Sequence, residues 1–381
     1  MKKEYLIIIF LLLGPFLDVT SFLNLPISIL VRGVFLASIT LHLILNKKEL
    51  KILFPLLIFG IISFIYQYFY LHFGIKISIS TIFKFLYLPI SILYFKSFIF
   101  PTDKEKIVSI ILMLYIGIYL FSYVTEIGAD AYLESDGKSG FKGLFSSINE
   151  FSAILVCLLP VVTSYLKEKK RFLLIIFLFI LSIFCSLLTG TKILMGGILF
   201  SIIYLLWQER EKLFFSRTRN QKIGICSIIL VVLICGCFLF PKTRTFQNMM
   251  IQQNFFQVKK IISLDFINKV VYNDRLTFLK DNYDYFKNQN IIKILLGIGI
   301  ENHDIKMVEI DFFDILFRYG IIGFIIFFGV LAVTINWKKI NKTSKISIIL
   351  LFIISLTSGH VLIYPAVSIY LGMIMNQSHS I

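Results

Sequence analysis

Four basic residues stand in or beside long apolar stretches of the sequence, where a charge needs a partner. Arg32, Lys84 and Arg318 lie inside such stretches, and Lys192 opens another. A charged side chain near the centre of a bilayer costs about 2.5–3.5 kcal/mol. Any one of the four could reach the headgroups or pair with an acid. Four cations at a common depth instead favour one pocket for an anionic group held in the membrane, such as a lipid phosphate.

A second group of charges begins the apolar stretch that contains Arg318. Asp311, Asp314 and Arg318 are spaced i, i+3 and i+7 and therefore share one helix face, with Glu309 just before them. An Asp314–Arg318 pair would neutralise that arginine within the helix. The same pair could orient a carboxylate that acts as a base, for which Glu309 and Asp311 are candidates. His303, in the preceding loop, is a further candidate, although a lone loop histidine is more often solvated surface.

The composition indicates a membrane protein. Of the 381 residues, 57% are apolar and 16% are charged, and the mean hydropathy is +0.86. An ordinary soluble domain has about a quarter of its residues charged. The apolar runs are continuous, whereas the strands of a membrane β-barrel alternate apolar and polar residues. We therefore predict an all-α polytopic membrane protein, whose five cysteines, all in apolar runs, are small hydrophobic residues rather than metal ligands or disulfides.

Charged residues, glycines and prolines divide the apolar sequence into twelve runs, each close to the length of about 20 residues that crosses a bilayer. The run from Arg171 to Trp207 is too long for one helix, and we divide it at Thr189-Gly190-Thr191-Lys192. The predicted transmembrane helices are 5–23, 27–45, 52–72, 78–95, 107–127, 148–166, 171–188, 191–207, 223–240, 310–335, 345–359 and 361–376.

The basic residues predict the orientation, because cytoplasmic loops carry the excess of Lys and Arg. With the N-terminus in the cytoplasm, the inner loops hold 21 of these residues and the short outer loops hold 4. Both termini are therefore predicted to be cytoplasmic. Residues 1–240 would hold nine transmembrane helices, residues 241–309 one large extracytoplasmic loop, and residues 310–381 the last three helices.

The large loop is long enough to contain structure of its own, and loops of this length are usually functional or disordered. Its residues Leu276, Leu279, Tyr283 and Phe286 recur at helical spacing. This spacing predicts an amphipathic helix that lies on the bundle. No internal repeat is visible, which disfavours transporters built from inverted halves.

Several short motifs resemble the superfamily of O-antigen ligases and Wzy-type polysaccharide polymerases, in order over about residues 140–330. The motifs are Gly143-Leu144-Phe145-Ser146-Ser147-Ile148-Asn149-Glu150-Phe151, Leu188-Thr189-Gly190-Thr191-Lys192, Asn273-Asp274-Arg275, Leu296-Gly297-Ile298-Gly299 and Asp311-Phe312-Phe313-Asp314-Ile315-Leu316-Phe317-Arg318-Tyr319-Gly320-Ile321-Ile322-Gly323. The resemblance implies a membrane-embedded glycosyltransferase of the type C class. Such an enzyme needs no metal ion and no cofactor, and acts at the outer face on glycans linked to undecaprenyl pyrophosphate.

The motifs also carry over individual roles. Lys192 matches the basic residue after the Thr-Gly turn, and Arg275 matches the loop arginine ahead of the Gly-x-Gly. Arg275 is therefore predicted to be catalytic as well as to bind pyrophosphate. The full predicted pyrophosphate-binding set is Arg32, Lys84, Lys192, Arg275 and Arg318.

The family pattern leaves the base of the reaction open. Eleven residues before Gly320 the ligases usually have His followed by Asn, whereas this chain has Glu309-Ile310. A sugar hydroxyl that attacks an anomeric carbon must lose its proton to a carboxylate or His within hydrogen-bond reach. The candidates are Glu309, Asp311 and His303, with Asp314 in a supporting role.

The leading hypothesis is a polymerase that joins undecaprenyl-pyrophosphate-linked oligosaccharide repeat units into a surface polysaccharide, such as O-antigen, capsule or exopolysaccharide. An O-antigen-type ligase is the nearest alternative. A flippase or other transporter of lipid-linked oligosaccharides is an alternative from a different class, but it should carry polar residues at the midplane of several helices. The expected location is the bacterial cytoplasmic (inner) membrane. The expected partners are the lipid-linked glycan, the bilayer, a chain-length regulator and a flippase, with no nucleic acid.

Overall fold

The computed structural model describes residues 3–101, 103–131, 139–208, 242–255, 268–269, 272–299, 306–359 and 361–376. These residues are mainly helical, and among them one antiparallel pair of short strands is formed by β1 (Ala129–Asp130) and β2 (Phe141–Gly143). The first helices are α1 (Lys3–Phe22), α2 (Ile27–Leu45), α3 (Leu50–Ile65), the π-helical turn η1 (Tyr66–Tyr70), α4 (Ile75–Lys96), α5 (Lys104–Val124), α6 (Ile148–Glu168), α7 (Phe172–Thr189) and α8 (Lys192–Gln208). The later helices are α10 (Arg244–Phe255), α12 (Arg275–Lys287), α13 (Ile291–Leu296), α14 (Asp311–Thr334), α15 (Lys342–Thr357) and α16 (Pro365–Ile374).

The predicted all-α polytopic class is confirmed. Within the described part of the chain, eight helices are long and apolar enough to cross a bilayer: α1, α2, α3 with η1, α4, α5, α6, α7 and α14. The apolar helices α8 and α16 are shorter. At 1.5 Å per residue, the ten residues of α16 span about 15 Å, or half of a hydrocarbon core. The last helix is therefore shorter than predicted, and the ninth predicted helix, 223–240, lies outside the described residues.

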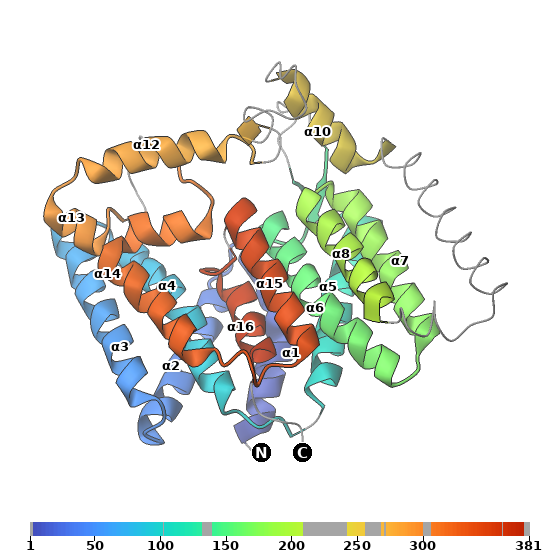
Figure 1. Ribbon diagram of the computed structural model, residues 1–381, viewed down its shortest axis with the longest axis horizontal. Helices are drawn as coiled ribbons and strands as arrows, with labels where there is room; N and C mark the ends of the chain where they lie inside the picture. The colour runs from blue at the N-terminus through green and yellow to red at the C-terminus, as the bar shows by residue number, and fades with distance from the viewer. Residues whose placement is uncertain are drawn as a thin grey trace.

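The shortest of these helices lies at the centre of the bundle. Nine of the ten residues of α16 are buried, against α4, α6, α1 and α15. In Figure 1, α3, α4 and α14 lie on one side of this centre, and α7 and α8 lie on the other. The helices α10, α12 and α13 of the predicted external loop lie at one end of the molecule, and both termini lie at the opposite end (Figure 1).

The predicted helix 310–335 is broken at Gly320. This residue has φ 69° and ψ −176° inside α14, and the two parts of α14 run in different directions (Figure 1). The break lets α13 pack backbone against backbone on α14. A Cβ on Gly320 would lie 2.3 Å from the Leu295 carbonyl oxygen, and a Cβ on Gly297 would lie 2.1 Å from the Arg318 carbonyl oxygen. Glycine is therefore required at both positions.

The predicted amphipathic helix of the external loop is confirmed as α12, but its buried face differs from the prediction. Arg275, Asn282 and Phe286 are buried, with Leu279 packed beside them, whereas Tyr283 is 55% exposed. The Asn282 amide donates to the Lys306 carbonyl at 2.8 Å. Leu279 and Phe286 were predicted correctly, but the polar residues Arg275 and Asn282 complete the buried face, so the apolar spacing alone placed part of it wrongly.

Candidate active site

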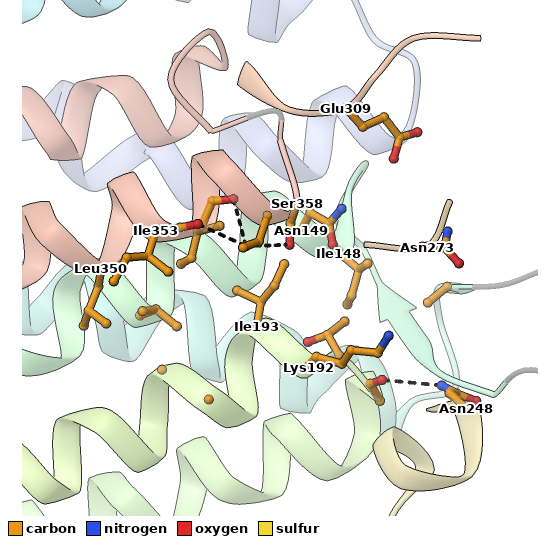
Figure 2. A pocket seen from close by; sticks show the side chains of 18 of the residues that line it. Ile148, Asn149, Lys192, Ile193, Asn248, Asn273, Glu309, Leu350, Ile353 and Ser358 are labelled. Carbon is orange, nitrogen blue, oxygen red and sulfur yellow. Dashed lines mark hydrogen bonds between the residues drawn. The ribbon is translucent and has the colours of Figure 1, made fainter. Parts of the chain in front are cut away.

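A cleft with a volume of about 650 Å³ opens at the end of the bundle that carries α10 and α12. This volume is typical of a site for a small molecule. The cleft is lined by the beginnings of α6 and α8, the end of α15, and residues of α10 and α12. Three predicted site residues, Lys192, Arg275 and Glu309, line it. Figure 2 shows Glu309 and Lys192 on opposite sides of the opening, with Asn149 between them.

Arg275 and Glu309 form an ion pair at the cleft. The Arg275 atoms Nη2 and Nε donate to Glu309 Oε2 at 2.7 and 3.2 Å, and Nη1 donates to the Thr357 carbonyl at 3.0 Å. A guanidinium has five N–H donors, so these bonds leave two of them for another ligand. Glu309 is 31% exposed, and its Oε1 accepts no hydrogen bond from the described residues. The pair therefore offers a cation with spare donors beside a carboxylate oxygen that can accept a proton.

Lys192 enters the cleft from the turn between α7 and α8. Gly190, at φ 65°, ends α7, and a Cβ there would lie 2.7 Å from the Ser139 carbonyl oxygen. The Thr191 hydroxyl lies 3.1 Å from the hydroxyl of Ser152 on α6. The close contact and the side-chain hydrogen bond fix the turn, and hence the residue that follows it.

Helix α10 forms hydrogen bonds that also hold the turn between α7 and α8 in place. The Asn248 amide accepts from the Ser139 N–H at 2.9 Å and donates to the carbonyls of Ser139 and Gly190 at 2.9 and 3.4 Å. Arg244 donates to the Leu188 carbonyl at 3.1 Å. Helix α10 thus holds Ser139, which lies just before β2, and the α7–α8 turn together.

Two helix N-termini converge on the cleft. Ile148 and Asn149 of the first turn of α6 line it, as do Lys192 and Ile193 of the first turn of α8. The first N–H groups of a helix have no partner within that helix, and the helix dipole makes this end positive. Together with Lys192 and Arg275, these termini make the mouth of the cleft attractive to an anion.

The deeper part of the cleft is apolar. It is formed by Gly196 and Phe200 of α8 and by Leu350 and Ile353 of α15, among others. Phe200 lies eight residues beyond Lys192, or about 12 Å along the helix. Phe200 and Ile353 are 38% and 50% exposed, so the floor offers accessible apolar surface. The cleft therefore joins a cationic mouth to an apolar floor.

Arg32 is not part of this cleft, which corrects the prediction of one pyrophosphate-binding cluster. Its guanidinium forms a salt bridge with Asp18 of α1 and donates to Ser28 Oγ at 2.9 Å. The Tyr115 hydroxyl donates to the other oxygen of Asp18. The charged side chains are 11% and 7% exposed. Arg32 has its counterion inside the bundle, on a different helix from its own.

Lys84 and Arg318 are also outside the cleft. The Lys84 ammonium lies 5.3 Å from the centre of the Tyr364 ring. Arg318 is 4% exposed, and its Nη2 contacts Met307 Sδ. The two cations are close enough to each other to interact electrostatically. The predicted set of cations is thus divided among three places, and only Lys192 and Arg275 share the cleft.

The acids of α14 differ from the prediction as well. Asp311 is fully buried and accepts hydrogen bonds from the N–H groups of Val361 and Leu362 at 2.8 and 2.9 Å. It therefore holds the connection between α15 and α16, and it does not line the cleft. Asp314 is 2% exposed and forms no ion pair with Arg318 in the structure, so the predicted pair is wrong. Arg318 Nη2 contacts Met307 Sδ instead, although Asp314 and Arg318 remain close enough to interact electrostatically.

His303 lies outside the described residues, and its predicted role stays a prediction. Among the residues that the structure describes, no group of three or more His, Cys, Asp or Glu side chains could hold a metal ion. Sequence reasoning missed Asp18 as the partner of Arg32, although an acid within an apolar run was the available signal. It quoted Asn149 within a motif without a role, and it missed Asn248 altogether because nothing local distinguishes that residue.

A comparison with protein-family models finds a match to a family described as O-antigen ligase like membrane protein, over residues 252–378. This third of the chain includes Arg275, Glu309 and the whole of α12 to α16. The match supports the resemblance drawn from the sequence motifs. No curated protein and no solved structure matches the chain.

Proposed function

Starting from the match to O-antigen ligase like membrane proteins, we propose that this chain is a membrane glycosyltransferase of polysaccharide assembly. It would join lipid-diphosphate-linked oligosaccharide repeat units into a polymer, and undecaprenyl pyrophosphate is the proposed carrier. The single observation that carries the proposal is the cleft that places Lys192 and the Arg275–Glu309 pair above an apolar floor.

The mouth of the cleft suits a diphosphate. Lys192 supplies a point charge, and Arg275 has two N–H donors left for a phosphate oxygen. The first turns of α6 and α8 add a positive end each. Preorganised positive groups in a site partly shielded from water stabilise the charge that develops on a leaving group. The proposal therefore assigns this task to the protein and not to a metal ion.

Glu309 is the proposed base. The hydroxyl oxygen of the acceptor sugar attacks the anomeric carbon of the donor, while the bond from that carbon to the diphosphate oxygen breaks. The diphosphate leaves with the electron pair, and the hydroxyl proton passes to Glu309 Oε1. Glu309 is preferred to Asp311 because it lines the cleft, whereas Asp311 is buried and holds two backbone N–H groups.

The apolar floor suits the lipid part of the substrate. Phe200 and Ile353 line the floor and leave part of their apolar surface exposed. A prenyl chain could lie there while its diphosphate reaches Lys192. The diphosphate and the sugars would then meet the charged mouth on the extracytoplasmic side, with both termini in the cytoplasm and the protein in the bacterial inner membrane.

A ligase that moves a finished glycan to another acceptor is the second candidate, because the matching family is described by that activity. A polymerase would work beside a flippase and a chain-length regulator. The length and attachment of the surface glycan separate the two candidates. Cells that lack a polymerase carry single repeat units, whereas cells that lack a ligase accumulate long unattached chains.

The deletion strain also tests the site when it is complemented with variants. Arg275→Lys keeps the charge but loses the planar fork, so polymer formation should fall about 10²–10³-fold, nearly as far as with Arg275→Ala. Lys287→Ala is the matched control, since Lys287 is a basic residue of the same helix that pairs with Asp284 outside the cleft. Wild-type polymer from a stably inserted Arg275→Ala protein would overturn the proposal.

A further inference from the structure

Asn149 is a polar residue of the cleft whose position the local structure does not explain. It is the second residue of α6, where asparagine is unfavourable unless it caps the helix. The cap is already supplied by Ser147, whose side chain accepts from the Glu150 N–H. Asn149 is therefore not required to begin the helix.

The amide of Asn149 also has no hydrogen-bond partner within the described part of the chain. It is half-buried, lines the cleft, and makes no hydrogen bond with any of the described residues. Figure 2 shows its side chain near Ser358, between Glu309 and Lys192. By contrast, the Asn248 amide, on the opposite wall, is engaged with Ser139 and Gly190. Asn149 thus presents an NH₂ donor group and a carbonyl acceptor to whatever fills the cleft.

We infer that Asn149 binds hydroxyl groups of the sugar that is joined directly to the diphosphate, and so contributes to sugar specificity. This inference rests on the proposed function. A phosphate oxygen only accepts hydrogen bonds and would leave the amide carbonyl unsatisfied. A sugar hydroxyl both donates and accepts, so two neighbouring hydroxyls can satisfy both groups of the amide. Lys192 and Arg275 remain to hold the charge.

Two lipid probes separate these contacts when binding is measured with the full-length protein in lipid nanodiscs. One probe is undecaprenyl diphosphate without sugar, and the other is the lipid-linked repeat unit extracted from cells that lack this gene. For Asn149→Ala, the Kd of the repeat-unit lipid should rise about tenfold, the equivalent of one or two net hydrogen bonds. The Kd of sugar-free undecaprenyl diphosphate should stay within about twofold, because its diphosphate contacts are unchanged.

Two further variants complete the test. Lys192→Met should weaken both lipids, which marks the diphosphate contact. Asn149→Asp keeps an acceptor for a sugar hydroxyl but adds a negative charge beside the diphosphate, so both Kd values should rise. If Asn149→Ala weakens both lipids equally, or neither, the inference is wrong. If the wild-type protein binds neither lipid, the proposed function fails instead, and the unfolding temperature of each variant verifies that it is folded.

Discussion

Arg275 and Glu309 meet at the edge of a cleft, whereas Arg32 and Asp18 meet inside the bundle. Both pairs join an arginine to a carboxylate on a different segment, and both arginine side chains are only about a tenth exposed. The difference lies in what surrounds the carboxylate. Glu309 is 31% exposed and has an oxygen with no hydrogen bond from the described residues. Asp18 is 7% exposed and receives the Tyr115 hydroxyl as well as Arg32.

The comparison teaches that a charge inside an apolar run is not by itself evidence of a binding site. A buried ion pair recovers in mutual attraction and hydrogen bonds what its groups lose when they leave water. The Arg32–Asp18 pair is complete in this sense, and it can serve packing alone. The Arg275–Glu309 pair is incomplete, since both residues line the cleft and each retains a hydrogen-bonding atom that no described residue occupies.

The largest expected effect is a loss of transfer rate when the Arg275–Glu309 pair at the cleft is changed. Glu309→Gln keeps the size of the side chain and an oxygen for Arg275, but it cannot take a proton, so the transfer rate should fall about 10²–10⁴-fold. Binding of the lipid-linked substrate should be retained. The rate is measured with purified protein and lipid-linked repeat units, with products resolved by length.

Asp311→Asn is the comparison variant for this experiment. It weakens the hydrogen bonds to Val361 and Leu362, so it should lower the free energy of unfolding by about 1–3 kcal/mol while the folded protein keeps its rate. If both variants give product at the wild-type rate, the base is neither carboxylate. His303 then becomes the next candidate.

A change in the buried Arg32–Asp18 pair should lower the stability of the protein and not its catalytic rate. Asp18→Asn leaves the buried Arg32 without a counterion, which should lower the free energy of unfolding by about 3–5 kcal/mol. Unfolding by heat or by denaturing detergent measures the change. The double variant Asp18→Leu with Arg32→Met should recover most of the loss, because neither charge remains. Asp284→Asn, which breaks the exposed pair with Lys287, should leave the unfolding temperature unchanged.

Rate measurements on the folded fraction sharpen this contrast. The folded fraction of Asp18→Asn should polymerise at close to the wild-type rate, because its effect is on stability. A folded Asp18→Asn protein that binds lipid diphosphate poorly would mean that Arg32 contributes to the site after all.

The smallest expected effect is that of removing the hydrogen bonds by which α10 holds the wall of the cleft. Asn248→Ala removes three hydrogen bonds from α10 to Ser139 and Gly190, which should lower stability by about 1–3 kcal/mol and activity severalfold through the position of Lys192. Gln247→Ala, at the neighbouring exposed position of the same helix, is the control. Equal activity of the two variants would show that α10 does not position the cleft. Protection of the α7–α8 turn from hydrogen exchange reports the same contact independently.

Most of the helices could be predicted because each is specified by its own continuous run of apolar residues. The run 27–45 coincides with α2, and the predicted 148–166 and 191–207 differ from α6 and α8 by one or two residues at their ends. A continuous apolar run in a membrane can satisfy its backbone only as a helix, so length and composition suffice. Length and composition do not predict short or interrupted helices, such as α16 and the two parts of α14, because these are stabilised by burial in protein.

Part of the candidate site could be predicted from motifs and from the placement of charges. Arg275 was identified by resemblance, Lys192 by resemblance and by its charge beside an apolar run, and Glu309 by its position before an apolar helix; the three share the cleft. Arg32 and Arg318 do not line the cleft, and the groups they contact, Asp18 and Met307, could not be foreseen because tertiary packing brings them near. The spacing of residues along the chain does not report which helices are neighbours. The charges alone therefore could not distinguish a buried ion pair, such as Arg32–Asp18, from a pair at a cleft, such as Arg275–Glu309.

The backbone contact between α13 and α14 places a different kind of limit on how this chain can diverge. An ion pair such as Asp18–Arg32 can be exchanged in two steps for apolar residues of similar volume. Gly297 and Gly320 cannot be replaced in this way, because a Cβ on either would clash with backbone atoms. A substitution at another position changes a side chain but cannot remove those backbone atoms. We expect diverging copies of this gene to lose the buried charges long before they lose these two glycines.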